Sequence, residues 1–268
     1  MANLYGKTSQ MRIETKFKDN KTYMSDVFYT PPLKLTRPFK QADGGLYIIM
    51  MSSSPGIMDG DVQDFEFNID DNSNTHITSQ TYEKIYKTID IPPVRNTKIK
   101  VGSNAYFKYF PLPTIPFKDS SFSSETIIEL KDESSRFSMV EIISCGRQGL
   151  GEKFEYKSFK LLTEVKKKKE LVYVDNTNFI PDEIDMENFG MLEGYTHLGN
   201  ILLFNFDIKD EELSEYNEII QSQGLDGGVS RTFSKDVVIR VMGYSAVELK
   251  GLAEEIIERA EGIHTTFV

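Results

Sequence analysis

The sequence predicts a mainly β protein, built as a multi-stranded stacked-sheet or β-helical body with about two α-helices near its C-terminus. Hydrophobic and polar residues alternate with a period of two in residues 11–17 and 65–69, as in strands with one buried face. Turn-forming clusters such as residues 43–45 and 71–74 separate the apolar segments. Helical periodicity of useful length begins only after about residue 183.

Further strands follow from the same alternation and from runs of β-branched and aromatic residues. We expect them at residues 105–110, 126–130, 136–144, 154–163 and 171–174. Residues 80–88 suit either a short helix or a strand, and their Tyr and Ile content favours a strand. The four lysines at 166–169 are expected at an exposed hairpin end.

The C-terminal third predicts a strand, a helix, a second strand and a final helix. The first helix covers residues 209–223 and ends at Gly224, between strands at 201–208 and 236–242. Residues 225–228 (LDGG) are expected to form a turn. A capping box at 245–248 begins the final helix. Its expected apolar face consists of Val247, Leu249, Leu252, Ala253, Ile256 and Ala260. No linker-like composition interrupts the chain, so we expect one domain over residues 1–268.

Composition excludes several classes of protein. The chain has 268 residues and a net charge of −10, which argues against binding to nucleic acid phosphates. Cys145 is the only cysteine, so an intramolecular disulfide is impossible and a reducing compartment is expected. Residues 1–10 lack an apolar signal segment, and no apolar run is long enough to span a bilayer. We therefore expect a cytoplasmic protein that binds neither membranes nor nucleic acid.

The motifs of common enzymes are absent from the sequence. It contains three histidines and lacks the G-x-S-x-G and P-loop patterns. It also lacks the Cys and His spacings of tight zinc sites, and Cys145 fits a buried strand better than a nucleophile. These features favour a protein that is not an enzyme. The alternative is a glycosidase-like hydrolase on a β scaffold, which would pair Asp61 with Glu83 or Glu141.

The segment 57–66 (IMDGDVQDFE) concentrates carboxylates. Asp59-Gly60-Asp61 is expected to form a tight turn, and Asp64 and Glu66 then lie on one face of the following strand. Such oxygen ligands hold hard or borderline cations loosely unless several converge. From residue type alone, an acidic turn before a solvated strand face is about twice as probable as a metal site.

Four strings in the same order resemble the UreD/UreH family of urease accessory proteins, and the UreH branch in particular. Residues 54–61 (SPGIMDGD) resemble its PPGG-x-x-GGD signature, and residues 77–86 (ITSQTYEKIY) resemble its TTQ-x-x-x-KIY segment. Residues 109–117 (YFPLPTIPF) resemble its proline-rich ExxPxPxIPF segment, and residues 146–152 (GRQGLGE) resemble its GRxxxGE. Each string alone is weak, but four in register over residues 25–175 are specific.

The resemblance implies a maturation factor that acts as a scaffold and metallochaperone for apo-urease. The implied partners are UreF, the GTPase UreG and apo-urease, in a dimer of heteromers joined through UreF. No cofactor is held tightly, and nickel is in transit through a polar path in this protein. The residues expected to line or approach that path are Asp59, Asp61, Glu66, Thr78, Glu83 and Glu141.

Overall fold

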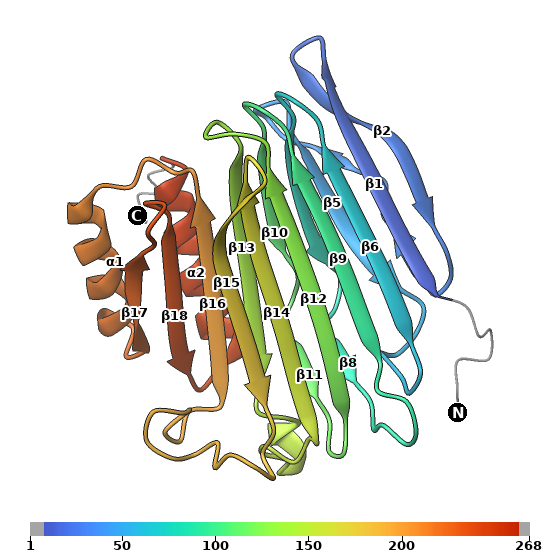
Figure 1. Ribbon diagram of the computed structural model, residues 1–268, viewed down its shortest axis with the longest axis vertical. Coiled ribbons are helices and arrows are strands. Elements are labelled where there is room, and N and C mark those ends of the chain that lie inside the picture. Colours follow the sequence, from blue (N-terminus) through green and yellow to red (C-terminus); the bar gives the residue numbers. More distant parts are fainter. Residues whose placement is uncertain (1–7, 263–268) are drawn as a thin grey trace.

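The computed structural model describes residues 8–262 and consists of two β-sheets stacked face to face, with two helices on the outer side of one sheet (Figure 1). Sheet A has the strand order β15-β14-β12-β9-β6-β1-β2. Its strands are β1 (Ser9–Lys18), β2 (Lys21–Tyr29), β6 (Val62–Ile69), β9 (Val94–Val101), β12 (Ser121–Leu130), β14 (Ser158–Lys167) and β15 (Glu170–Phe179).

Sheet B has the order β17-β18-β16-β13-β10-β7-β5-β3, with three short strands paired beside this path. Its main strands are β3 (Leu33–Leu35), β5 (Leu46–Ser52), β7 (Asn74–Ser79), β10 (Tyr106–Phe110), β13 (Arg136–Ser144), β16 (His197–Phe204), β17 (Asp226–Arg231) and β18 (Val237–Gly243). The short strands are β4 (Phe39–Lys40), β8 (Glu83–Ile85) and β11 (Thr114–Pro116).

The middle of the chain coils between the two sheets. From β5 to β14 the chain passes repeatedly from one sheet to the other, and each return adds a strand parallel to the previous one in that sheet. Figure 1 shows the result as β6, β9, β12 and β14 lying side by side. The predicted mainly β fold with stacked sheets or β-helical coiling is therefore confirmed.

Alternation within each strand produces the hydrophobic core. One apolar face of each sheet points between the sheets, where two separate clusters of buried side chains form. A third cluster fills the space between the outer face of sheet B and the helices α1 (Asp210–Ser222) and α2 (Ala246–Ala260). No helix in the described part of the chain is long and apolar enough to cross a membrane.

The final helix begins where the sequence predicts but buries a different face. Ser245 is its N-cap, and the Ser245 hydroxyl accepts a hydrogen bond from the Val247 N–H at 3.2 Å. Val247 is 68% exposed, so its assignment to the apolar face is wrong. The buried stripe runs through Ala246, Leu249, Leu252, Ala253, Ile256 and Ile257. At 100° per residue, Val247 falls outside this stripe.

Several element boundaries differ from the prediction. Only Glu83–Ile85 within residues 80–88 forms a strand, and β14 begins at Ser158 rather than at residue 154. The strand predicted at 201–208 ends at Phe204, because Asn205 adopts a positive φ of 60°. Residues 226–231 form the edge strand β17 rather than a turn. The edge strand β2 was not predicted, because it is exposed on both faces and shows little alternation.

Candidate functional site

The interior between the sheets contains two rows of polar residues at the same level. On sheet A, the inward-facing row is set by direct strand register. It consists of Thr97, Thr126, Thr163 and Asp175. On sheet B, the corresponding row consists of Glu141 and Asn200 in the interior and of Arg240 and Gly228 at the exposed edge. Because register neighbours point to the same face of a sheet, each row forms a continuous polar stripe across the strands.

Apolar clusters lie on both sides of these rows. The first inter-sheet cluster includes Ile128 and Leu202 on one side of the polar level. The second includes Ile143 and Leu198 on the other side. Polar side chains in the middle of a sandwich core are unusual, since a buried polar group without a partner is destabilising. The rows therefore divide the core into two parts, and the polar level that they form between the two apolar clusters is called the passage below.

An ion pair joins the sheets at the inner end of the passage. Arg95 of β9 donates hydrogen bonds to Glu83 of β8 and to Gln63 Oε1, the latter at 2.9 Å from Nε and 2.6 Å from Nη2. The Arg95 and Glu83 side chains are only 12% and 28% exposed. Burial alone would lower the pKa of Arg95, but Glu83, Tyr109 and Glu141 together hold it above its usual value. These four groups thus act on one another in the interior.

Glu141 of β13 lies between the two ends of the passage. Burial is the main cause that raises the pKa of Glu141 to about 7, and repulsion from Asp175 adds to it. A hydrogen bond from Asn200 and the positive charges of Arg240 and Arg95 act in the opposite direction. Glu141 stays partly accessible, whereas its neighbour Asn200 in the sheet is buried. A carboxyl group that titrates near neutral pH in the interior can both bind a cation and release it.

The outer end of the passage lies between β15, the edge strand of sheet A, and β18, which is next to the edge strand β17 of sheet B. Arg240 Nη2 donates to Asp175 Oδ2 at 2.6 Å, and Arg240 Nε donates to Asn200 Oδ1 at 2.9 Å. The Asn200 side chain also interacts with Glu141, and this hydrogen bond lowers the pKa of that carboxyl group. A pocket of about 280 Å³ opens at this edge, and its lining includes Tyr173, Asp175, Asn200, Gly228, Ser230 and Arg240.

The predicted acidic turn has a local structural role. Asp59 is buried, and Asp59 Oδ1 accepts hydrogen bonds from the N–H groups of Ile89, Asp90 and Ile91 at 2.9–3.1 Å. Burial would raise the pKa of Asp59, but these three donors outweigh it and lower the pKa. Asp61 Oδ2 accepts from the Met58 N–H at 2.8 Å. Burial raises the pKa of Asp61. Both carboxylates are therefore engaged by nearby backbone.

The six predicted site residues do not form one cluster. Glu83 and Glu141 lie in the passage, where both act electrostatically on Arg95. Glu66 lies on the outer face of sheet A and accepts a hydrogen bond from Asn68 at 3.2 Å. Thr78 lies on the outer face of sheet B and donates to the Phe110 carbonyl at 2.7 Å. The glycosidase-like pairing of Asp61 with Glu83 or Glu141 stays a prediction.

Cys145, His197 and Arg147, whose side chains could take part in chemistry, have contacts that fit structural roles. Burial raises the pKa of the Cys145 thiol to about 11, which disfavours the reactive thiolate. Burial lowers the pKa of His197, a strand residue hydrogen-bonded to Thr196 at 3.0 Å. Arg147 Nε donates to Glu152 Oε2 at 2.8 Å and anchors the loop after β13. Within residues 8–262, His, Cys, Asp and Glu side chains form no group of three or more that could hold a metal.

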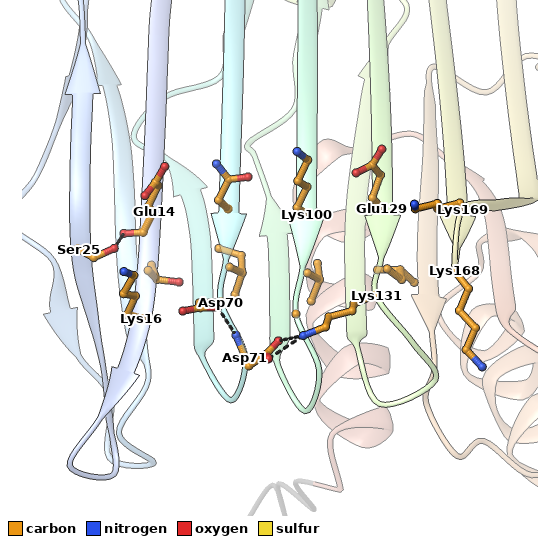
Figure 2. Close-up of a pocket in the computed structure, with 16 residues that line it drawn as sticks. Glu14, Lys16, Ser25, Asp70, Asp71, Lys100, Glu129, Lys131, Lys168 and Lys169 are labelled. Carbon is orange, nitrogen blue, oxygen red and sulfur yellow. Dashed lines mark hydrogen bonds and ion pairs between the residues drawn. The ribbon is translucent and has the colours of Figure 1, made fainter.

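A larger pocket of about 870 Å³ lies on sheet A, near the strand ends and the β14–β15 hairpin (Figure 2). Figure 2 shows charged side chains of both signs along it, with Glu129 and Lys100 on neighbouring strands. Lys131 Nζ donates to both carboxylate oxygens of Asp71, at 2.7 and 2.8 Å. None of the six predicted site residues lines this pocket. Its mixed charge argues against a specific ion site.

Sequence reasoning missed most of the passage. Arg95, Asp175, Asn200 and Arg240 lie in separate strands far apart in the chain, and each looks like an ordinary polar strand residue. The threonines at 97, 126 and 163 would have been a usable signal. In each strand the next inward residue toward the C-terminus is apolar, and these residues are Ile99, Ile128 and Val165. A polar residue at a core position is the pattern that marks such a row.

Comparison with known proteins gives a consistent result. The sequence model of the UreD urease accessory protein family matches residues 7–266. The chain is 38% identical over 256 residues to the urease accessory protein UreH of Helicobacter pylori (strain G27), covering 95% of each chain. It is 30% identical over 258 residues to the urease accessory protein UreD of Acetivibrio thermocellus, covering 96% of this chain and 98% of the relative.

Proposed function

Because this chain belongs to the UreD family of urease accessory proteins, its role lies in urease maturation, and we propose that it passes nickel to apo-urease through the polar passage between its sheets. In this proposal the chain acts in the cytoplasm with a UreF-type accessory protein and a UreG-type GTPase. The UreF-type protein joins two such assemblies. The chain itself is a scaffold and conduit rather than an enzyme.

The observation that carries the proposal is the pair of facing polar rows inside an otherwise apolar core. A row of threonines opposite Glu141 and Asn200 has no evident value for packing, since apolar residues of similar size would fill the same space without a need for hydrogen bonds. The arrangement suits an ion that moves through the core. It offers oxygen atoms along the whole length of the passage.

Weak ligation is what transfer requires. Nickel(II) accepts carboxylate, amide and hydroxyl oxygen ligands, but it binds nitrogen and sulfur ligands more tightly. Glu141 is the central carboxylate of the passage, and Thr126 and Thr163 lie in the opposite row. Single oxygen ligands spread over several strands provide successive weak sites. A closed site of four strong ligands would retain the metal.

Complementation of cells that lack their own UreD/UreH tests the proposal. Glu141→Leu removes the central carboxylate, and Glu66→Leu removes a carboxylate from the outer face of sheet A as a matched control. We expect the Glu141 variant to form the complex with its partners but to activate urease at least tenfold less. The Glu66 variant should activate urease normally. Equal activation by both variants would show that the passage does not carry nickel.

A further inference from the structure

Three chain segments are joined at one end of the sheets, the lower end in Figure 1. They follow β13, β15 and β18 and cover residues 145–157, 180–196 and 244–247. An ion pair between Lys153 and Glu187 connects the first segment to the second. The rings of Tyr195 and Tyr244, with centroids 4.9 Å apart, connect the second to the third. The Thr196 hydroxyl also donates to the Tyr244 carbonyl at 3.2 Å. The three segments therefore form one surface, called the loop surface below.

The loop surface exposes several large apolar side chains, namely Leu150, Phe189, Tyr244 and Val247. Phe189 is 91% exposed although the loop that carries it is fixed on both sides. Met186 and Leu192 are buried in the second inter-sheet cluster, and the Leu192 N–H donates to the Met186 carbonyl at 3.1 Å. An aromatic side chain on an ordered loop loses little conformational entropy on binding, and such side chains dominate the energetics of protein interfaces.

The charged groups around Phe189 are acidic. Residues 180–196 contain five carboxylates and no basic residue, and the carboxylates belong to Asp182, Glu183, Asp185, Glu187 and Glu193. Among the described residues, only Glu187 of these five forms an ion pair. Charged residues at the rim of an interface steer the approach of a partner of opposite charge. The loop surface is therefore complementary to a basic partner.

We propose that the loop surface docks a protein partner whose contact area has an apolar recess surrounded by lysine and arginine side chains. Phe189 enters the recess, Leu150 packs beside it, and the carboxylates of residues 182–193 face the basic side chains. A second copy of this chain is disfavoured as the occupant, because a two-fold contact would place the same carboxylates opposite one another. The inference goes beyond the passage and rests on the proposed function only for the choice of binding probes.

Binding of the purified full chain to purified apo-urease, UreF-type protein and UreG-type GTPase tests the apolar contact. Phe189→Ser should weaken the binding of one of these three proteins at least about tenfold. Phe233→Ser is the matched control, because it removes a fully exposed phenylalanine from the β17–β18 loop and should leave all three affinities unchanged. Both variants should keep the wild-type Tm. Unchanged binding of all three proteins by Phe189→Ser, or an equal loss with Phe233→Ser, would overturn the docking surface.

The basic character of the partner is tested with two carboxylates that make no side-chain hydrogen bond or ion pair among the described residues. Asp182→Asn/Glu183→Gln should weaken binding of the same protein several-fold at about 0.05 M NaCl and much less at about 0.5 M NaCl. Glu211→Gln/Glu215→Gln removes two exposed carboxylates from α1 and should have no effect. No loss at low salt, or a loss that salt does not reduce, contradicts a basic partner.

The docking surface and the passage fail independently. Glu141→Leu leaves the loop surface intact, so it should bind all three proteins like the wild type. If the Phe189 and Asp182/Glu183 variants bind normally while Glu141→Leu is defective in urease activation, the passage stands and the docking surface fails. If these variants lose binding as predicted while Glu141→Leu activates urease fully, the docking surface stands and the passage fails.

Discussion

Arg95 and Glu83 hold the two sheets together across the interior by an ion pair between β9 and β8. The Arg95 guanidinium also lies over the ring of Phe65, with 4.9 Å between Cζ and the ring centroid. This contact explains how a positive charge can remain inside a β sandwich. Nε and Nη2 of the arginine donate to acceptors, and the plane of the guanidinium lies over an aromatic ring.

Removal of the acid should therefore destabilise the protein. Glu83→Ala leaves Arg95 with Gln63 as its remaining hydrogen-bond acceptor among the described side chains, and should lower the free energy of unfolding by about 2 kcal/mol. Urea denaturation measures the difference. Glu83→Gln keeps an acceptor and should have a smaller effect. If Glu83→Ala matches the wild type, the pair does not hold the sheets together.

Stability should depend on pH through Glu141. Burial raises the pKa of Glu141 in the folded protein to about 7, above its value in the unfolded chain. The contribution of its protonated form is complete below the unfolded-state pKa and is lost as pH rises through the folded-state pKa. Glu141→Gln should remove this loss, which is on the order of 1–3 kcal/mol.

The measurement is urea denaturation of the wild type and of Glu141→Gln at pH 5 and pH 8. The wild type should lose more stability than the variant between these two pH values. A parallel change in both proteins would mean that the pKa of Glu141 is not raised in the folded protein. Glu66→Gln, on the outer face of sheet A, should follow the wild type.

Asp59 should matter for the loop at residues 89–91. Asp59→Ala removes the acceptor of three backbone N–H groups, so it should lower Tm and speed amide hydrogen exchange at Ile89, Asp90 and Ile91. Because the pKa of Asp59 is lowered in the folded protein, its stabilising effect is present above the unfolded-state pKa and is lost in acid. Unchanged exchange in this loop would contradict the assignment.

The sequence allowed the strands with strong alternation to be predicted, because period-two burial is a local property. Residues 136–144 illustrate this, since the predicted strand and β13 coincide. The coil of parallel strands was only one of the predicted options, because pairing such as that of β6 with β9 depends on long-range packing. The polar rows could not be predicted from the sequence for the same reason. Glu141, Asn200 and Arg240 meet only after three strands have paired.

At the acidic turn, the sequence suggested a metal site where the structure has hydrogen bonds to the backbone. Asp59 and Asp61 attract attention in the sequence as neighbouring carboxylates, but the structure uses both as hydrogen-bond acceptors for backbone N–H groups. Residue type and spacing do not distinguish a ligand from a turn anchor. The two roles are distinguished only by the folded structure, which places the N–H groups of Met58 and Ile89 next to these carboxylates.

The final helix provides a stability test that is independent of the passage. Leu252 is fully buried between α2 and sheet B, so Leu252→Ala should lower the free energy of unfolding by about 2–5 kcal/mol. Val247 lies on the exposed side of the same helix, and Val247→Ala should change it by less than about 0.5 kcal/mol. If thermal or urea denaturation shows that Val247→Ala destabilises the protein more than Leu252→Ala, the helix packs through a different face.

The nickel content of urease tests the central claim most directly. Urease is purified from cells that express either the wild-type chain or Glu141→Leu in place of their own UreD/UreH protein, and nickel per active site is measured by elemental analysis. Co-purification with the partners is checked in both strains. We predict that urease from the Glu141→Leu strain contains at most a tenth of the wild-type nickel although the complex assembles. Full nickel occupancy with the Glu141→Leu chain would contradict transfer through the passage.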